Sequence, residues 1–264
     1  MPRLQLFELE DQPWFPKVLR RGVTDFLAYV WSLSDDRYSE FVKRLKGAMA
    51  AMGETQLLDM ASGSAGPVPK LLEMLESQEG YQATALLTDL YPEISAFEKA
   101  KAANPGRIDY VTTPVDATAV PATYKGFRIM CNSFHHLPPE MARKVLADAV
   151  AQRRGIAIME LVERRGPAIA MTAAALINVP LTTPFIRPVR VDRLALTYLM
   201  PLIPIAAAFD GVVSCLRTYS VEEMRELTHG LSDDYIWEID RLTNPGNPFG
   251  LMMLIGRPAT PSKA

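Results

Sequence analysis

The amino-acid sequence predicts an α/β fold built on a mostly parallel β-sheet. Short apolar runs alternate with amphipathic segments between residues 56 and 161, as strands and helices do in such sheets. A loop rich in glycine and alanine follows the first apolar run. Two further apolar runs near the carboxyl terminus flank the turn-forming residues 244–248, a pattern typical of an antiparallel hairpin.

Two helices are predicted before the first strand. Apolar residues recur at helical spacing over residues 17–33. Residues 34–36, Ser-Asp-Asp, offer side chains that can cap a second helix, which ends at Gly53. We therefore expect a helical N-terminal extension over residues 1–53.

Five strands and three helices alternate after this extension. The predicted strands cover residues 56–60, 83–87, 108–111, 127–131 and 156–161, and the predicted helices cover residues 68–78, 93–103 and 139–153. Parallel strands need crossover connections, which the helices supply. We expect helices on both faces of the sheet and right-handed connections.

The alternation stops after the fifth strand and returns at Ser220. Residues 163–219 are rich in Ala, Leu, Ile, Pro and Arg, and they far exceed the roughly twelve residues that a crossover needs. Ser220 and Glu223 have the spacing of a capping box, and strands are predicted near residues 235–239 and 251–255. We expect one domain, residues 1–264, with four parts: an N-terminal cap (1–53), a core (54–162), an apolar insertion (163–219) and a C-terminal helix and hairpin (220–264).

The composition limits the classes of binding partner and the cellular compartment that we expect. The formal net charge of -2 disfavours nucleic-acid binding, which requires a basic surface. Two cysteines, Cys131 and Cys215, make no disulfide framework, and acids replace the apolar run of a secretory leader near the start. We expect a cytoplasmic protein. No Cys/His cluster has metal-ligand spacing, so no metal site is expected.

The loop after the first strand suggests a ligand that approaches the backbone closely. The order Ala61-x-Gly63-x-x-Gly66 is one residue away from the dinucleotide-binding fingerprint. An acid followed by small residues, from Asp59 to Ala65, is a second cofactor pattern. A glycine-rich turn without a ligand is the third interpretation.

Polar groups follow the next three strands. Asp89 comes after the second strand and can accept ribose hydroxyls. Asp116 follows the third strand and can accept from an adenine amino group, with the Ala117 N–H as a donor. Residues 132–137 form a polar and aromatic cluster after the fourth strand. Carboxyl ends of parallel strands share one edge, so we expect these groups to lie together.

The order of these groups resembles the successive motifs of class I S-adenosylmethionine-dependent methyltransferases. The matching positions are Asp59, Gly63, Asp89, Asp116 and residues 132–137. The resemblance covers about residues 56–161 and the tail from Ser220, and leaves out residues 163–219. It implies a three-layer Rossmann-like fold whose seven-stranded sheet has the order 3-2-1-4-5-7-6, with strand 7 antiparallel.

The resemblance also implies a set of contacts to S-adenosylmethionine. Asp59 would meet the methionine amino group, Gly63 would let the backbone pass the cofactor, and Asp89 would bind the ribose. The other implied contacts are Ala61 in the loop, Leu90, Tyr91, Asp116 and Ala117 around the adenine, and Asn132, Ser133 and Phe134 beside the methionine part. Ala61 and Ala65 replace two glycines common in this loop, and their Cβ atoms are expected to narrow the room for the cofactor.

His135 and His136 are the candidate general bases, because an imidazole titrates near neutral pH. The alternative is that they only pack or hydrogen-bond near the cofactor. Glu160 and Glu163, near the end of the fifth strand, either face the acceptor or pair with Arg164 and Arg165 on the surface. His229 is expected at a helix C-terminus.

Four aromatic residues are candidates for an acceptor pocket: Trp14, Phe15, Phe26 and Tyr29. The alternative is that they only pack the first helix onto the sheet. We expect methyl transfer to a small or medium lipophilic acceptor, such as a phenol, a quinone-like ring or a lipid. Two alternatives remain. The protein could use the same cofactor for a reaction other than methyl transfer, or it could be a non-catalytic binding protein at the membrane periphery.

Residues 194–209 are almost free of polar side chains. A transmembrane helix needs about 20 apolar residues, and Pro201 and Pro204 interrupt this shorter run, so a membrane span is not expected. A buried helix, a lid over a lipophilic acceptor and an interfacial segment remain open. Arg187, Arg190 and Arg193 precede the run and could meet lipid head groups, so residues 185–209 are the predicted place of peripheral contact with the inner face of a membrane.

Overall fold

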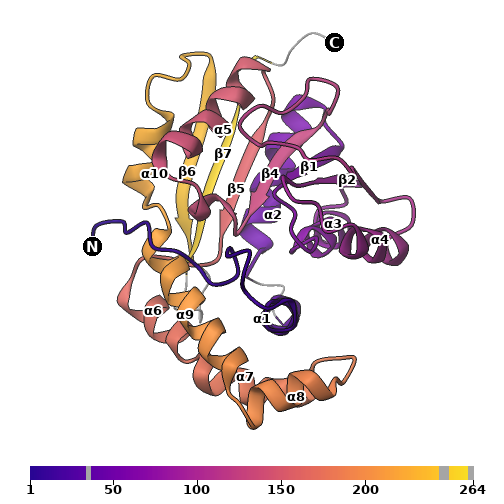
Figure 1. Cartoon of the computed structure of the whole chain (residues 1–264). Helices are drawn as coiled ribbons and strands as arrows, with labels where there is room; N and C mark the ends of the chain where they lie inside the picture. Colours follow the sequence, from indigo (N-terminus) through magenta and orange to yellow (C-terminus); the bar gives the residue numbers. More distant parts are fainter. Residues whose placement is uncertain (34–36, 244–249, 261–264) are drawn as a thin grey trace. The chain divides into compact units, whose positions relative to one another are not determined.

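The computed structural model describes residues 1–33, 37–243 and 250–260 (Figure 1). Contacts group the chain into two compact units. The helical unit comprises Met1–Ser34 and Val162–Tyr219, and the sheet unit comprises Asp35–Leu161 and Ser220–Ala264. The first helix of the predicted N-terminal cap therefore groups with the insertion and the second with the sheet, while the expectation of one domain stays a prediction.

A seven-stranded sheet with the order β3-β2-β1-β4-β5-β7-β6 forms the centre of the sheet unit. Its strands are β1 (Gln56–Met60), β2 (Thr84–Thr88), β3 (Ile108–Tyr110), β4 (Phe127–Cys131), β5 (Ile156–Glu160), β6 (Tyr235–Leu242) and β7 (Leu251–Pro258). The first five are parallel, and β7 is antiparallel to both β5 and β6. The predicted sheet order and the antiparallel strand 7 are confirmed.

Helices cover both faces of this sheet, with α5 and α10 on the near face in Figure 1 and α2 behind it. The helices of the unit are α2 (Ser39–Met52), α3 (Val68–Ser77), α4 (Ile94–Ala103), α5 (Pro139–Ala151) and α10 (Val221–Thr228), with a 3-10 turn, η1 (Phe134–His136). The predicted capping box is present, because the Glu223 N–H donates to Ser220 Oγ and the Ser220 N–H donates to the Glu223 carboxylate. The predicted cap at residues 34–36 and the turn at 244–248 lie outside the described residues.

The core of the sheet unit explains why its strands are so apolar. Every residue of β5 is buried, because helices cover both faces of the sheet there. Phe41, Leu45 and Met49 of α2 recur at helical spacing and are fully buried in the same cluster. Gly53 ends α2 in the left-handed region, with a φ of 68° that a glycine adopts without strain.

The helical unit packs two long helices and three short ones around its own core. Its elements are α1 (Lys17–Ser32), α6 (Gly166–Ala173), α7 (Ala175–Thr182), η2 (Thr183–Phe185), α8 (Val191–Tyr198) and α9 (Leu202–Arg217). Helix α1 packs on α9, where a Cβ at Gly22 would lie 2.4 Å from Ile203 Cδ1. The glycine therefore permits the close approach of the two helices.

The apolar run is interrupted at Pro201, as predicted, but the prediction is wrong for Pro204, where the helix continues. Helix α8 ends at Tyr198 and α9 begins at Leu202, so Pro201 caps α9 and Pro204 falls in its first turn, where a missing N–H costs least. In the described part of the chain, no single helix is long and apolar enough to cross a bilayer. Two bent pairs of helices meet that test together, one bent by 46° (α6 with residues 175–185) and one by 78° (α8 with α9).

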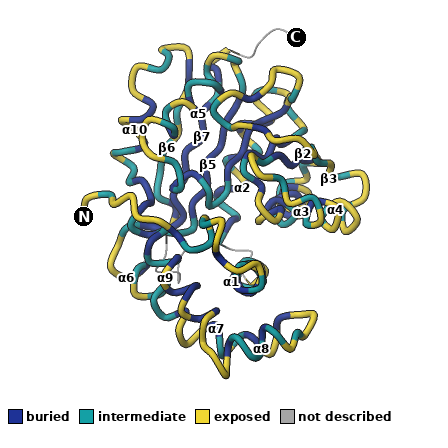
Figure 2. Tube along the Cα trace, in the orientation of Figure 1, coloured by how far each residue is buried: buried dark blue, intermediate teal, exposed yellow. Residues whose placement is uncertain are grey.

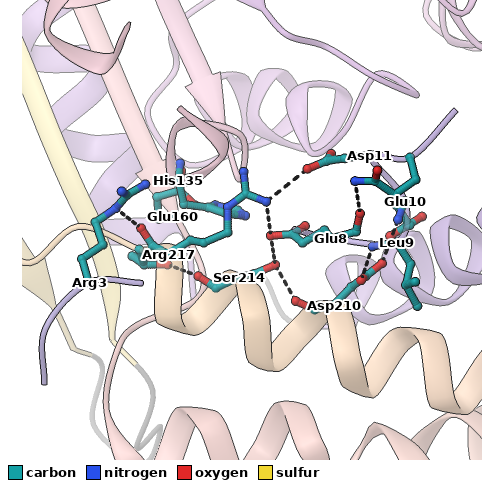
Figure 3. A network of polar contacts seen from close by, with 12 residues as sticks. Arg3, Glu8, Leu9, Glu10, Asp11, His135, Glu160, Asp210, Ser214 and Arg217 are labelled. Atoms are coloured by element: carbon teal, nitrogen blue, oxygen red, sulfur yellow. Dashed lines mark hydrogen bonds and ion pairs between the residues drawn. The ribbon is translucent and has the colours of Figure 1, made fainter. Parts of the chain in front are cut away.

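An internal polar network ties the N-terminal segment to α9 (Figure 3). The N–H groups of Leu9 and Glu10 donate to the two carboxylate oxygens of Asp210, at 2.6 and 3.0 Å. Arg217 pairs with Glu8 at 3.2 Å and with Asp11 at 3.1 Å. The pKa of Glu10 is raised to about 8, mainly by burial and also by the nearby charges of Asp210 and Glu8. The acids of this segment thus serve contacts within the helical unit.

Candidate functional site

The loop after β1 is fastened to the end of β2. The Ser62 N–H donates to the Thr88 carbonyl at 3.0 Å, and the Thr88 N–H donates to Ser62 Oγ at 3.1 Å. The Thr88 hydroxyl also donates to the Asp59 carbonyl at 2.8 Å. These bonds fix the loop at the carboxyl edge of the sheet, the edge at which open α/β sheets bind ligands.

The backbone of this loop has positive φ values, which favour glycine, although two of its residues with such values are alanines. Ala61 and Ala65 have φ values of 65° and 73°, and Gly63 and Gly66 have values of 52° and 43°. A Cβ in the left-handed region costs about 1 kcal/mol or more. Ala65 is buried in the core cluster, so its Cβ packs inward and does not take room from a cofactor. The expected narrowing thus does not apply to Ala65.

Asp59 ends β1 as a buried carboxyl group. Its pKa is raised to about 8, mainly by burial and also by the negative charge of Asp89, while a hydrogen bond from Ser62 opposes the shift. Only about one in ten of these carboxyl groups is ionised at pH 7. A cationic group placed beside Asp59 would favour the ionised form.

Asp89 links the loops that follow β1 and β2. One carboxylate oxygen accepts from the Gly63 N–H at 2.8 Å, and the other accepts from the Tyr91 N–H at 2.8 Å. Each oxygen keeps a second lone pair for another donor. The predicted neighbours Leu90 and Tyr91 are both exposed, Tyr91 to 83%. Asp89 therefore lies beside the glycine loop, and its role in ribose binding stays a prediction.

The loop after β3 reaches the same edge. The Val115 N–H donates to the Asp89 carbonyl at 2.9 Å. The exposed Asp116 accepts from the N–H and the hydroxyl of Thr118, both at 2.8 Å, through one carboxylate oxygen. Asp116 and the half-buried Ala117 are therefore held on a short turn next to the Asp89 backbone.

Asn132 and Ser133 bring two unsatisfied polar groups to the end of β4. Asn132 has a φ of 51°, and its Oδ1 accepts from the Leu161 N–H at 2.7 Å. Within the described ranges, Asn132 Nδ2 and Ser133 Oγ are buried and have no hydrogen-bond partner. Buried polar atoms are rarely left unpaired in folded proteins, so these two atoms indicate a place for a polar ligand. The next predicted contact, Phe134, is fully buried.

His135 and Glu160 form a buried pair between η1 and the end of β5. His135 Nδ1 lies 2.6 Å from Glu160 Oε2, and the His135 N–H donates to Glu160 Oε1 at 3.1 Å. The two residues are exposed to only 3% and 1%. A carboxylate at this distance favours the tautomer that carries the ring proton on Nδ1, in which Nε2 is an acceptor. The ring of His136 lies against that of His135, with 4.3 Å between centroids.

This pair corrects the expectation for the two glutamates. Glu160 was expected to face the acceptor or to pair with Arg164 and Arg165 on the surface. It is buried and binds His135, so the surface position is wrong, and a position facing the acceptor stays a prediction. Glu163 is also buried, at 2% exposure, so a surface position is wrong for it as well. The strand order could have indicated the His135–Glu160 pair, because β4 and β5 are neighbours and Cys131 lies opposite Met159.

Cys131, the last residue of β4, stays a thiol. Burial raises its pKa well above the ordinary value, and the charges of Asp59 and Glu160 raise it further. A thiolate nucleophile is therefore not available here. The predicted His229 is the C-cap of α10, and its carbonyl accepts from Arg143, so its structural position is as expected.

The four aromatic candidates lie in the helical unit. Phe15 and Phe26 are buried in its core, where α1 packs on α9, and Tyr29 is partly buried against the same cluster. Trp14 is 66% exposed and meets Phe15 edge to face, with 6.3 Å between centroids. Packing accounts for Phe15 and Phe26, and the partner of their helix is α9. A role of the four residues in acceptor binding stays a prediction.

No protein-family model and no curated protein matches the sequence. Among solved structures, the chain is similar to PigF with S-adenosylhomocysteine, with a TM-score of 0.52, 14% identity and coverage of 94% of this chain and 62% of that chain. It is also similar to a presumed O-methyltransferase from Nostoc punctiforme, with a TM-score of 0.50, 12% identity and coverage of 96% and 64%. The chain thus spans less than two thirds of the length of either protein. These likenesses and the sheet order show that the chain has the Rossmann-like fold of class I S-adenosylmethionine-dependent methyltransferases.

Proposed function

We propose that this protein transfers the methyl group of S-adenosylmethionine to a hydroxyl group of a small or medium lipophilic acceptor. The observation that carries the proposal is the His135–Glu160 pair, which lies directly after the strand that ends in two unsatisfied polar groups. The fold likeness to PigF with S-adenosylhomocysteine and to a presumed O-methyltransferase supports the same class of reaction.

The residues at the carboxyl edge of the sheet fit the cofactor. Asp59 is a buried acid that would ionise beside the amino group of the methionine part. Asp89 offers carboxylate lone pairs to the ribose hydroxyls, next to the open backbone of Gly63. Asn132 Nδ2 and Ser133 Oγ are donors that match the carboxylate of the methionine part. When bound, the cofactor supplies an electrophilic methyl group on a positively charged sulfur.

His135 is the proposed general base. Its Nδ1 is held by Glu160, so Nε2 can accept the proton of an acceptor hydroxyl, and the Glu160 carboxylate then stabilises the imidazolium. An acidic hydroxyl, such as that of a phenol or a reduced quinone, gives up its proton to an imidazole most readily. The apolar insertion of residues 163–219 supports a lipophilic acceptor.

Calorimetry with S-adenosylhomocysteine tests the cofactor assignment. We expect the folded protein to bind it, and we expect Asp89→Ala to lose most of the affinity because the ribose loses its acceptor. A matched control is Asp109→Ala, an exposed acid on β3 that pairs with Lys101 away from the loop. Absence of binding to the wild-type protein would contradict the proposal.

Turnover with a panel of phenols and reduced quinones, read by mass spectrometry, tests the base. We expect His135→Gln to lower kcat about 10²- to 10⁴-fold while S-adenosylhomocysteine affinity is kept. Glu160→Gln should also lower kcat, because the imidazolium loses its carboxylate. His229→Gln, at the C-cap of α10, is the control. Unchanged kcat in His135→Gln would remove the base from the mechanism.

A further inference from the structure

The helical unit exposes large apolar side chains along three helices that contact one another, α7, α8 and α9, and we call these side chains the apolar face. Figure 2 marks the exposed stretches of the chain in yellow. The apolar face comprises twelve exposed side chains: Leu176, Ile177, Leu181, Phe185, Val189, Val191, Tyr198, Leu199, Met200, Leu202, Ile205 and Phe209. The opposite side of α9, with Ile203 and residues 206–208, is buried in the core of the unit. Contiguous exposed apolar surfaces of this kind mark interaction sites.

The most exposed part of this face is the break between α8 and α9, which we call the proline tip (residues 198–202). All five of its residues are exposed, Leu199 to 82%, and the helices on either side are bent by 78°. An exposed helix–helix connection whose side chains are apolar apart from one tyrosine hydroxyl is unusual, because loops face water and are commonly polar.

The N–H groups of the proline tip find acceptors within the helical unit. The N–H groups of Leu199 and Met200 both donate to the Ala195 carbonyl at 3.0 Å, and the Leu202 N–H donates to the Met200 carbonyl at 2.6 Å. Pro201 has no N–H. The Tyr198 hydroxyl donates to the Pro180 carbonyl at 2.6 Å. Internal pairing of this sort is what a segment needs in order to enter a medium that has no water.

Charge around the apolar face is positive. The helical unit contains ten basic and seven acidic residues, a formal charge of +3 in a chain whose net charge is -2. Between residues 166 and 209 the sequence has three arginines and a single acid, Asp192. Arg21 and Arg190 both pair with that acid, and Arg187 is exposed between η2 and α8. Most of the remaining acids of the unit are held by the network around α9 or, for Asp25, by Arg193.

We propose that the apolar face of α7, α8 and α9 docks on an anionic lipid bilayer. The proline tip enters the boundary between head groups and acyl chains, and Arg187, Arg190 and Arg21 meet the phosphates. A second copy of the chain fits the face less well, because a two-fold contact through it would bring the same arginines of both copies together. The proposal does not depend on methyl transfer.

Flotation of the full chain with vesicles tests the proposal. We expect binding to vesicles of phosphatidylcholine with about one third phosphatidylglycerol, weaker binding to phosphatidylcholine alone, and a decrease with added salt. Leu199→Gln should lower the partition coefficient about tenfold, because a leucine side chain no longer leaves water. Arg187→Gln should lower it only for the anionic vesicles. Ile236→Gln, the same change at an exposed position on β6 of the sheet unit, is the matched control.

Two outcomes would overturn the proposal: equal flotation of the wild-type chain and Leu199→Gln, or no flotation of the wild-type chain with dimers that Leu199→Gln dissociates in sedimentation. A second variant, Leu199→Trp, excludes a folding artefact, because its emission should shift to the blue on addition of anionic vesicles and stay unchanged if the tip remains in water. Binding of S-adenosylhomocysteine by each variant reports that the sheet unit is intact.

Discussion

At the scale of single residues, the two alanines of the cofactor loop are its most informative feature. Ala61 is partly exposed with a φ of 65°, so it bears the cost of a left-handed Cβ without the core packing that Ala65 gains. Ala61→Gly should raise the free energy of unfolding by up to about 1 kcal/mol, because strain relief exceeds the added flexibility of the unfolded chain. Urea denaturation measures this change. Destabilisation by Ala61→Gly would mean that the Cβ makes contacts that outweigh the strain.

The protonation of Asp59 leads to a prediction about proton release when the cofactor binds. Its pKa of about 8 means that the folded protein holds a proton there at neutral pH. If the ionised form meets the cofactor's amino group, binding releases nearly one proton at pH 7, and affinity rises about tenfold from pH 7 to pH 9. Calorimetry in buffers of different ionisation enthalpy counts the proton. Asp59→Asn should bind more weakly and release none, and equal proton release by this variant would assign the effect elsewhere.

At the scale of elements, the N-terminal segment is the part whose attachment should depend on pH. Glu10 has a pKa raised to about 8, so its protonated form favours the docked segment. That contribution is complete below the ordinary pKa of about 4.5 and is lost as the pH rises through about 8. Backbone amide exchange at Leu9 and Glu10, whose N–H groups bind Asp210, should therefore become less protected above pH 8, beyond the intrinsic increase of exchange with pH.

Glu10→Gln provides the comparison for this element. A glutamine stays neutral, so the variant should keep the protection of these amides across the same pH range. Glu98→Gln, an exposed position on α4 of the sheet unit, should behave as the wild-type chain. Equal loss of protection in Glu10→Gln and the wild-type chain would show that another group detaches the segment.

The elements also show what the sequence could predict and why. Local patterns were sufficient for β1, β4 and the capping box at Ser220, since their signals lie within a few residues. The Glu160–His135 pair joins residues 25 positions apart and depends on the register of two strands, so a motif alone could not reveal it. The grouping of α1 with α9 was also out of reach, because it depends on the close approach at Gly22.

At the scale of the whole molecule, cofactor binding should increase the thermal stability of the folded protein. The candidate contacts come from loops after β1, β2, β3 and β4, so a bound cofactor connects segments spread over residues 59–133 of the sheet unit. A ligand at one hundred times its Kd stabilises the folded state by about 2.7 kcal/mol. For a protein of this length, that free energy corresponds to an increase in Tm of about 5–10 °C. Thermal unfolding with S-adenosylhomocysteine should show this increase in the wild-type chain and in Leu199→Gln, but not in Asp89→Ala. A shift that persists in Asp89→Ala would place the nucleoside away from the end of β2, and the assignment of the ribose site would then have to change.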